Sequence, residues 1–452
     1  MSLCTGQLFL SSVHTVRGRR QMKKEINIGL LGYGTVGSGV AKILQGHQYD
    51  LQYKLGVQVS IKKVLVKNIT KSRETELASG VFTDRLDEVL NDPSIDLIIE
   101  VMGGTNDARD AIERSLYAGK GVVTANKDVM AEFGQELLRL ADEQKCDLFY
   151  EASVGGGIPL IRTMEDGLAS DRITALTGIV NGTTNFILTK MKHENMSYED
   201  ALAEATALGF AEVDPSADVD GIDAARKMVI LASLAFSTEV QLEDVFVRGM
   251  KDIQDGDLKL AEEFGYTVKM AGSAEKNEDG ISVAVEPVFF PNSHPLASVN
   301  NEYNAVYIYG DAVGETMFYG PGAGSLPTAT SVTADVVAAC RNLLLGVNGK
   351  RVHAPQHERK VKKDSEMFAR YFHRIIVQDE VGVLTKLSSI YSKHDASLAT
   401  IVQHPDKKEA GAELVFITHR MSRQQHLDVL EELHETPEVL GVLSHYRVEG
   451  DE

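Results

Sequence analysis

The sequence predicts an α/β protein of three domains, and three stretches of pattern lead to this expectation. From residue 26 to 151, short apolar strands alternate with amphipathic helices, which is the order that right-handed crossovers and a parallel sheet require. From 151 to 320, glycine-rich turns and mixed strands and helices predict an α+β domain. From 371 to 450, the order strand–helix–strand–strand–helix–strand predicts a ferredoxin-like unit. A chain of 452 residues also exceeds what one compact core usually accommodates.

The elements of the first domain follow one another closely. An apolar strand at 26–31 runs into a glycine turn, and apolar residues at helical spacing follow through Leu44. A helix-like piece around 84–90 separates the second and third strands. The further strands are 57–66, 95–101, 121–126 and 147–152, and the further helices are 106–118, 128–144 and 328–345. We expect the last helix to return to this domain and complete it.

The boundaries follow from changes in these patterns. Residues 1–24 are predicted to be a disordered extension, 25–150 the first domain, completed by about 321–345, and 151–320 the second, with antiparallel strands in 281–310. Residues 346–370 are polar, basic and poor in large apolar side chains, so we expect a solvated linker. Residues 371–452 form the third domain, with strands at 371–378, 397–404, 412–419 and 440–448 and helices at 383–394 and 422–435.

Composition excludes several classes of function. The chain has 65 acidic and 46 basic residues, a formal net charge of -19, which disfavours binding to nucleic acid or to an anionic membrane. No apolar run approaches the roughly 20 residues that a membrane-spanning helix needs. Cys4, Cys146 and Cys340 lie far apart without the spacing of a zinc site. We therefore expect neither disulfides nor zinc, and a reducing cytoplasmic setting.

A glycine turn lies at the first strand–helix junction. The residues Gly32, Tyr33, Gly34, Thr35, Val36 and Gly37 match GxGxxG. In that pattern the first glycine permits a tight turn, the second lets the backbone approach a pyrophosphate, and the third allows close helix packing. The positive end of the following helix attracts the phosphates. This position predicts a Rossmann-like NAD(P)-binding domain with Gly32, Gly34, Thr35, Val36 and Gly37 at the cofactor; the alternative is a purely structural turn.

The end of the second strand carries a lysine where NAD-binding proteins usually have an acid. The strand ends Val64-Leu65-Val66-Lys67-Asn68, with Lys63, Lys71 and Arg73 nearby. A carboxylate at this place would bind the 2′-hydroxyl of the ribose, whereas a lysine favours the 2′-phosphate of NADP. Lys67 therefore predicts a preference for NADP(H), with NAD(H) possible. A surface lysine at a strand end is the alternative.

The densest run of charge lies between residues 212 and 223. Its five acids are Glu212, Asp214, Asp218, Asp220 and Asp223. The spacing does not fit a calcium loop of the EF-hand type. A solvated acidic loop remains one interpretation and an active site another. On a helix over 221–236, Asp223 and Lys227 would share one face, four residues apart, although exposed pairs of that kind are common.

This run resembles the homoserine dehydrogenase family over its whole length. The matching pattern is Ala205-x3-Gly209-Phe210-Ala211-x2-Asp214-Pro215-x2-Asp218-Val219-x-Gly221-x-Asp223-x3-Lys227. Four further stretches resemble the same family in the expected order between about residues 26 and 345: Thr124–Lys127, Glu151–Pro159, Asn181–Asn185 and Gly320–Gly324. The resemblance implies reversible, NAD(P)H-dependent reduction of L-aspartate 4-semialdehyde to L-homoserine, in threonine and methionine biosynthesis.

The resemblance also implies roles for individual residues. Lys227 and Lys127 lie beside the reacting carbonyl, with Lys227 the usual proton donor and Asp218 orienting or tuning it. Glu212 and Asp223 bind the amino-acid end of the substrate. Gly103, Lys127 and Gly322 join the glycine loop and Lys67 at the cofactor. Glu151 and the backbone carbonyls of Val154, Gly156 and Ile158 form a monovalent cation site, usually for Na⁺. The chemistry agrees, since hydride addition to an aldehyde produces an alkoxide that needs a cationic proton donor.

The C-terminal pattern resembles an ACT domain. Gly382, in the stretch Val377–Leu384, lies at the first strand–helix turn, where an amino-acid ligand would meet the helix N-terminus. The family usually has proline before this glycine, and Val381 stands there instead. The resemblance implies feedback regulation by threonine, through paired ACT domains in a homodimer or homotetramer. The alternative is a dimerisation module without a ligand.

Two rival functions compete with this interpretation. Aspartate-semialdehyde dehydrogenase acts on the same aldehyde but needs a cysteine nucleophile with a partner base. Cys4 lies in the extension, Cys146 precedes a core strand and Cys340 lies in an apolar helix, so none has a promising setting. A non-catalytic sensor that binds an amino acid and NADPH is the other rival. Such a sensor has no need of a proton donor, which the set around Lys227 would supply.

Overall fold

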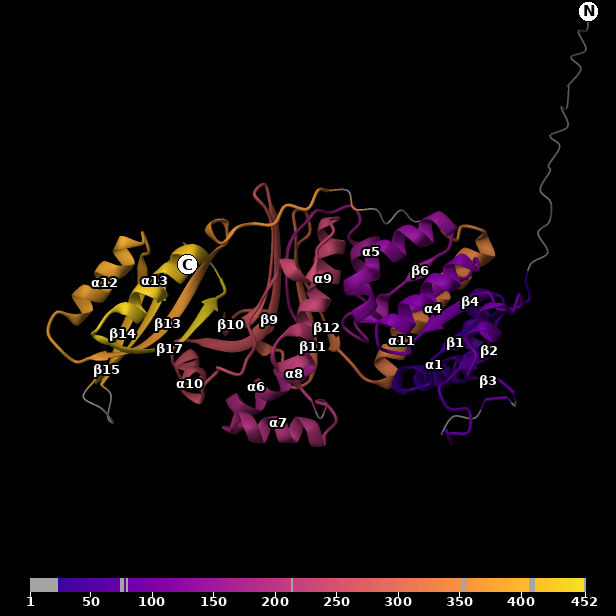
Figure 1. Cartoon of the computed structure of the whole chain (residues 1–452), viewed down its shortest axis with the longest axis horizontal. Coiled ribbons are helices and arrows are strands. Elements are labelled where there is room, and N and C mark those ends of the chain that lie inside the picture. Colours follow the sequence, from indigo (N-terminus) through magenta and orange to yellow (C-terminus); the bar gives the residue numbers. More distant parts are fainter. Residues whose placement is uncertain are drawn as a thin grey trace, which may run out of the picture.

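The computed structural model describes residues 23–73, 77, 78, 80–212, 214–350, 355, 357–405 and 411–450. Most of the predicted extension, residues 1–22, lies outside this part of the chain. The described residues form two sheets, one of six strands and one of eleven, arranged along the long axis of the molecule (Figure 1). No helix within the described residues is long and apolar enough to cross a membrane.

The six-stranded sheet is parallel, as the strand–helix alternation predicted. Its order is β3-β2-β1-β4-β5-β6, the doubly wound arrangement with its switch point between β1 and β4. The strands are β1 (Glu25–Leu31), β2 (Gln58–Leu65), β3 (Phe82–Thr83), β4 (Leu97–Glu100), β5 (Gly121–Thr124) and β6 (Leu148–Phe149). The helices between them are α1 (Thr35–Gly46), α2 (Gln48–Leu55), α3 (Leu86–Leu90), α4 (Asn106–Tyr117) and α5 (Lys127–Gln144). The sequence patterns predicted neither β3 nor α2.

Helix α11 (Ser325–Leu345) returns to this sheet from far along the chain, as predicted. Figure 1 shows it in orange among the indigo and purple elements. It packs on α1 so closely that a Cβ on Gly39 would come within 2.7 Å of the Ser325 carbonyl oxygen. Val332, Val336 and Cys340 of α11 join one apolar core with Ile28 and Leu30 of β1. Part of the nucleotide-binding unit is therefore supplied from beyond the second domain.

The eleven-stranded sheet follows the order β12-β11-β7-β9-β10-β17-β13-β15-β14, with β8 paired to β10 and β16 to β13. The strands of its first half are β7 (Ile173–Ile179), β8 (Val245–Val247), β9 (Tyr266–Asn277), β10 (Gly280–Pro291), β11 (Tyr303–Gly310) and β12 (Gly314–Pro321). The predicted antiparallel strands in 281–310 are present as β10 and β11. The helices of this region are α6 (Gly182–Glu194), α7 (Tyr198–Ala207), α8 (Ser216–Val219), α9 (Ile222–Phe236) and α10 (Asp255–Glu263).

The C-terminal unit has the predicted strand–helix–strand–strand–helix–strand order. Its elements are β13 (Phe368–Gln378), α12 (Val383–Lys393), β14 (Leu398–Pro405), β15 (Gly411–Thr418), β16 (Met421–Ser422), α13 (Arg423–Glu435) and β17 (Val439–Val448). Neighbouring strands of β17-β13-β15-β14 are antiparallel, which is the ferredoxin-like arrangement. The sequence did not predict that β17 also pairs with β10, in parallel, so that the two units share one sheet.

Buried groups cross this shared sheet. The Phe289 ring of β10 lies 4.7 Å from the ring of Phe372 and 4.8 Å from that of Tyr446, between centroids. Asp257 of α10 is fully buried, and its carboxylate accepts hydrogen bonds from the Tyr446 hydroxyl (2.6 Å) and the Arg374 guanidinium (3.0 Å). The C-terminal unit is therefore held by a continuous core as well as by strand pairing.

The linker predicted over 346–370 stays a prediction, but part of its described stretch is docked on the second domain. Val361 forms a bridge with Ile281 at the start of β10. Lys362 is buried and its ammonium lies 3.0 Å from the Glu275 carboxylate, while Arg359 pairs with Asp244 at 2.6 Å. The basic residues that suggested solvation instead fasten the segment to the second domain. The first strand of the C-terminal unit begins at Phe368, slightly before the predicted boundary.

A buried lysine sits on the face of this sheet away from α9. Lys269 is 1% exposed, and its ammonium donates to the side-chain oxygen of Asn185 (3.1 Å) and to the Val299 carbonyl. Burial, with a smaller effect from the charge of Lys192, lowers the pKa of Lys269 to about 7. The unfolded chain, with an ordinary lysine pKa of about 10.4, therefore binds more protons than the folded chain between these two values.

We expect Lys269→Met to change how stability depends on pH. Between about pH 7 and pH 10 the unfolding free energy of the wild type should rise relative to that of the variant, by at most about 1.4 kcal/mol per pH unit. Below pH 7 the difference between the two proteins should be constant. Urea unfolding at several pH values measures this, and parallel curves from pH 7 to pH 10 would contradict it.

Candidate active site

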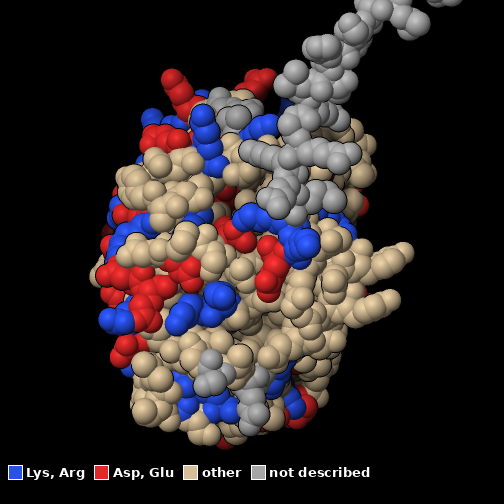
Figure 2. Space-filling model, turned by 90° about the vertical axis from the view of Figure 1, so that its right-hand side faces the viewer, with Lys and Arg blue, Asp and Glu red and all other residues tan. Residues whose placement is uncertain are grey.

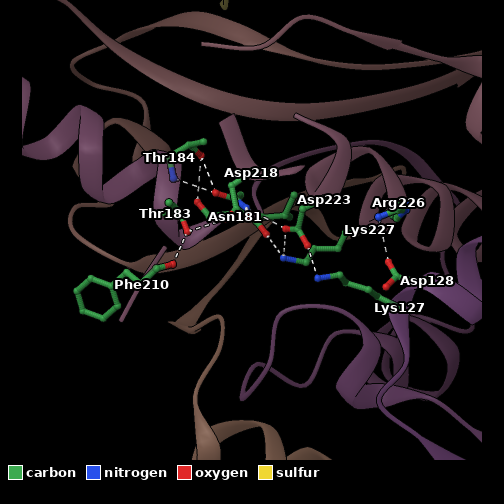
Figure 3. Close-up of polar contacts among 11 residues, drawn as sticks. Lys127, Asp128, Asn181, Thr183, Thr184, Phe210, Asp218, Asp223, Arg226 and Lys227 are labelled. Atoms are coloured by element: carbon green, nitrogen blue, oxygen red, sulfur yellow. Dashed lines mark hydrogen bonds and ion pairs between the residues drawn. The ribbon is translucent and has the colours of Figure 1, made fainter. Parts of the chain in front are cut away.

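The first part of the site comes from the start of α9. Gly221 precedes the helix with φ at +84°, a left-handed turn that suits glycine, and the helix then carries Asp223 and Lys227 one turn apart. The Lys227 ammonium donates to the Asp223 carboxylate (2.6 Å) and to the Val180 carbonyl oxygen (2.7 Å). Both side chains are largely buried. The pair is fixed in place (Figure 3), unlike the exposed pairs that this spacing usually produces.

The second ammonium comes from the nucleotide-binding sheet. Lys127 is the first residue of α5, directly after β5, and Asn126 caps that helix by accepting from the Val129 backbone at 3.1 Å. The Lys127 ammonium lies 2.5 Å from the other oxygen of Asp223. The structure thus brings together two lysines that are far apart in the sequence, with one buried acid between them (Figure 3).

Asn181 ties the two buried acids together. As the cap of α6 its side-chain oxygen accepts from the Thr184 amide (2.9 Å), so its amide group is oriented. That group donates to Asp218 (2.7 Å) and to Asp223 (2.9 Å). Asp218 therefore contacts Asp223 and the lysines through Asn181. The predicted role of Asp218, orienting or tuning Lys227, stays a prediction: its hydrogen bonds reach the lysine through Asn181, whereas its charge acts on Lys227 directly.

The charges of the cluster shift one another. Burial raises the pKa of Asp218, and the Asp223 charge adds to this effect against the hydrogen bond from Asn181. Burial alone would also raise the pKa of Asp223, but Lys227 and Lys127 outweigh it and hold that pKa well below its usual value. Burial lowers the pKa of Lys127, but Asp223 outweighs burial and the net pKa is raised. Lys127 is consequently an ammonium at neutral pH, able to give a proton.

The remaining acids of the run lie at the surface. Glu212 is exposed and makes no hydrogen bond or ion pair with the cluster in the described part of the chain. Asp214 accepts from the Ser216 backbone (3.1 Å), and Asp220 pairs with Lys251 (2.6 Å). The solvated interpretation therefore holds for these acids, whereas Asp218 and Asp223 face the lysines.

The glycine turn lies at the switch point of the parallel sheet. Gly32 has φ at +101°, and a Cβ there would come within 2.5 Å of the Val101 carbonyl oxygen at the end of β4. A Cβ on Gly37 would meet the Gly32 carbonyl at 2.3 Å, whereas the space beside Gly34 is open. The loop therefore packs tightly on the protein side and leaves room on the side where a pyrophosphate would meet Thr35 and Val36, the first residues of α1.

Two other glycines proposed for the cofactor lie in contrasting surroundings. Gly103, just after β4, has φ at +73° and open space beside it. A Cβ on Gly322 would meet the Asn304 side chain at 2.1 Å, and Gly322 in turn touches Gly156. Gly103 is thus free to approach a ligand, whereas Gly322 is needed for close packing of two loops.

Two cations stand at the end of β2. Lys67 is exposed. The Arg73 guanidinium lies 4.4 Å from the centre of the Phe82 ring and 6.0 Å from that of Tyr33, inside the glycine turn. Lys63 points elsewhere, toward the Gly80 carbonyl. Arg73 is therefore a further candidate for the cofactor site, which the sequence indicated only as a cation near Lys67. On the nucleotide-binding end as a whole, acidic and basic side chains are intermixed (Figure 2).

The glycine-rich loop after Glu151 packs against α11. The Glu151 carboxylate accepts from the backbone amides of Ile161 and Arg162, both at 2.8 Å, so it caps a helical turn. The Ser331 hydroxyl donates to the Gly156 carbonyl at 2.6 Å. Gly155 and Gly156 both have positive φ, which turns the chain sharply between the carbonyls of Val154 and Ile158. A cation here would be held by main-chain oxygens, with the Glu151 side chain already engaged.

The cysteines do not suit thiol chemistry. Cys146 and Cys340 are buried and free. Burial raises the pKa of Cys146 to about 11 and that of Cys340 to about 12, so neither supplies a thiolate near neutral pH. Cys4 lies outside the described residues. The rival mechanism through a thioester finds no nucleophile among the described cysteines.

A parallel sheet with a GxGxxG turn at its switch point, facing two ammonium groups and a shared acid, defines an NAD(P)-dependent oxidoreductase. Residues 32–151 match the family model described as homoserine dehydrogenase, NAD binding domain, and residues 159–337 match that of homoserine dehydrogenase. The chain belongs to the homoserine dehydrogenase family.

Individual relatives agree along nearly the whole chain. Homoserine dehydrogenase of Bacillus subtilis is 52% identical over 429 residues, which cover 95% of this chain and 99% of that one. A crystal structure of a homoserine dehydrogenase from Thiobacillus denitrificans matches with a TM-score of 0.88, at 34% identity over 94% of this chain and 98% of the other. A hyperthermophilic archaeal homoserine dehydrogenase in complex with NADPH matches with a TM-score of 0.58, at 26% identity over 70% of this chain and 97% of the other.

Proposed function

We propose that the cluster of Lys127, Lys227, Asp218 and Asp223 carries out the homoserine dehydrogenase reaction. The observation that supports this most directly is the sharing of Asp223 by two ammonium groups, one from α5 and one from α9. A nicotinamide dinucleotide held by the glycine turn would supply the hydride for aldehyde reduction. As the carbonyl oxygen gains charge, a lysine ammonium beside it stabilises the alkoxide and gives it a proton, leaving a neutral amine.

Lys227 is the better candidate for the proton donor. Its two hydrogen bonds, to Asp223 and to the Val180 carbonyl, hold its ammonium in one orientation, which is what proton transfer to a defined atom requires. Lys127 is more exposed and has a single acid partner, so it is free to turn toward the substrate. Asp223 and Glu212 are proposed to bind the amino-acid end, with the exposed Glu212 closing on the substrate ammonium.

The preference for NADP(H) is proposed from the cations at the end of β2. Lys67 and Arg73 stand where a 2′-phosphate would lie, beside the glycine turn. We expect Lys67→Glu to lower kcat/KM with NADPH by at least about tenfold and to change that with NADH by less than threefold, since a hydrogen bond to a charged group contributes roughly 1.5–3 kcal/mol. Steady-state rates with both cofactors measure the ratio. An equal effect on the two would contradict the assignment.

A monovalent cation site is proposed for the loop over residues 154–158. The support is the buried turn of this loop, in which Gly155 and Gly156 have positive φ. Ser331 of α11 fixes the Gly156 carbonyl by a hydrogen bond. The ligands would be the main-chain oxygens of Glu151, Val154, Gly156 and Ile158. Sodium is the expected ion, and its role would be to hold the loop against α11.

Threonine is the proposed allosteric ligand of the C-terminal unit. Gly382 precedes α12 with φ at +96° and open space beside its Cα, at the place where a ligand carboxylate would meet the helix N-terminus. We expect threonine to inhibit the wild type and Gly382→Asp to abolish that inhibition, because the new carboxylate repels the ligand. Rates measured across a threonine titration test this. Equal inhibition of both proteins would contradict a threonine site at Gly382.

A homodimer or homotetramer and a cytoplasmic setting complete the proposal. Buried free Cys146 and Cys340 support a reducing compartment. The assay that tests the proposal as a whole is homoserine oxidation, with NAD and NADP compared and threonine present or absent. Turnover that favours NADP and falls with threonine is the expected result. Cofactor binding without any turnover would support a sensor instead.

A further inference from the structure

The nucleotide-binding part of the chain meets the acidic part along a seam between α5 and α9. Two ion pairs cross the inner end of this seam side by side (Figure 3). One joins Lys127 to Asp223 at 2.5 Å. The other joins the next residue of α5, Asp128, to Arg226 of α9 at 3.2 Å. Arg226 thus stands beside Lys227 in the chain, as Asp128 stands beside Lys127.

A cavity borders the rest of the seam. A cavity of about 660 Å³ lies between the two helices, with an apolar floor that includes Met130, Leu138 and Val229. A third ion pair, Arg139 with Glu239 at 2.9 Å, crosses between α5 and the segment after α9, and Glu239 lines the cavity. Apolar side chains of both helices, such as Leu137 and Val229, also pack in one core, so the ion pairs add to that packing in fixing how the helices sit.

Asp128 and Arg226 lie within ion-pair distance but are not joined by a hydrogen bond. The Oδ1 atom of Asp128 is buried and has no hydrogen-bond partner among the described residues, although a guanidinium nitrogen lies 3.2 Å away. The carboxylate and the guanidinium are therefore close enough for a hydrogen bond but are not aligned for one. One carboxylate oxygen is thus shielded without a hydrogen bond while about a third of the Asp128 side chain is exposed, so closer alignment with Arg226 would be favourable.

In the proposed reaction, the Lys127 side chain turns from Asp223 toward the substrate. In this structure its ammonium is bound to Asp223, which also accepts from Lys227 and Asn181. When Lys127 turns toward the substrate, the inner end of the seam loses one of its two ion pairs. Asp128 follows Lys127 directly in α5, so its contact with Arg226 is the one that remains.

We propose that Asp128 and Arg226 are positioning residues, which keep the start of α5 docked on α9 while Lys127 exchanges Asp223 for the substrate. The inference rests on the catalytic role proposed for Lys127. Neither residue contacts the reacting atoms in this scheme. They fix the place from which Lys127 acts.

The two residues also affect Lys127 electrostatically, in opposite senses. The charges that face Lys127 are Asp223 and Lys227 from α9, Asp218 from α8, and Asp128 with its partner Arg226. Asp128 is among the charges that raise the pKa of Lys127 against burial, after Asp223. Removing the Asp128 charge should therefore lower that pKa, whereas removing Arg226, which offsets Asp128, should raise it further.

The test compares Asp128→Asn and Arg226→Gln with a matched control, Glu239→Gln, which breaks the outer pair of the same seam. In the direction of aldehyde reduction we expect both inner variants to lower kcat about tenfold with little change in KM for NADPH. The rate should fall at alkaline pH as Lys127 loses its proton. This fall should move to lower pH in Asp128→Asn and to higher pH in Arg226→Gln. The control should stay within twofold of the wild type at every pH.

A charge exchange separates positioning from electrostatics. Asp128→Arg combined with Arg226→Asp restores an ion pair across the seam, so kcat should recover most of its loss. Inner variants that behave like Glu239→Gln, or an exchange no better than either single variant, would overturn the inference. A wild type without turnover would instead refute the proposed function, and an active wild type with near-normal Lys127→Ala would refute the role of Lys127.

Discussion

Replacing Lys227 with alanine is expected to lower kcat by about two to four orders of magnitude, the range that a positioned general acid contributes. The variant loses the ammonium held by Asp223 and the Val180 carbonyl, so a developing alkoxide has no fixed proton donor at that place. The dissociation constant of NADPH should change by less than threefold, because Lys227 lies on α9 and the glycine turn on the other sheet. Steady-state rates and a fluorescence titration of NADPH measure the two quantities.

The matched control for this variant is Lys251→Ala. Lys251 also pairs with an acid of the same run, Asp220 at 2.6 Å, but about half of its side chain is exposed. An exposed pair contributes roughly 0.2–1 kcal/mol, so the control should keep normal turnover. If Lys227→Ala retained a rate near that of the control, the proton donor would have to be sought elsewhere, with Lys127 the first candidate.

Asp223→Asn should reduce both activity and stability. The variant leaves two ammonium groups without the acid that they share, and its single amide oxygen can accept at only one of the two positions, the one facing Lys127 or the one facing Lys227 and Asn181. Removing one partner of a buried ion pair costs about 3 kcal/mol, and kcat should fall at least a hundredfold because both lysines lose their anchor. Denaturant unfolding at pH 7 and steady-state rates measure the two effects.

The stability effect should depend on pH in one direction. Because the lysines hold the pKa of Asp223 below its usual value, the carboxylate stabilises the folded state above the unfolded pKa of about 3.9. That contribution is lost as the pH falls below this value toward the folded pKa, so the difference between wild type and variant should shrink in acid. Asp220→Asn, at the exposed pair, is the control. A difference that stayed constant from pH 7 to pH 3 would contradict the expected coupling.

Local patterns predicted the fold well, because each depends on residues close together in the chain. The GxGxxG turn, the parallel strands and the ferredoxin-like order follow from spacing and alternation, and the structure contains all three. Spacing says little about how domains join. The pairing of β17 with β10 joins residues more than 150 positions apart, at Phe289 and Val448, and a short apolar strand has many possible partners.

The sequence predicted which residues make up the site, but not how their side chains contact one another. The positions of Asp223 and Lys227 came from a long motif and that of Lys127 from the separate stretch Thr124–Lys127, since spacing alone cannot say that they meet. Asn181 could be expected to cap a helix, because asparagine before Gly182 is a common start. Its other contacts, to acids 37 and 42 residues onward, depend on how α6 and α9 pack and leave no mark in the local sequence.

The strand pairing between β10 and β17 determines what deletion of the C-terminal unit would do. Cutting the chain before β13 would unpair the end of β10 at Val288 and Phe289, beyond the stretch Val283–Val285 that β8 covers, leaving an open edge there, and would expose the ring of Phe289 to water. Such an edge recruits strands from other molecules. A shortened protein would be prone to self-association, so loss of activity in it would say nothing about regulation. Single substitutions at the turn before α12 test regulation while β17 stays paired with β10.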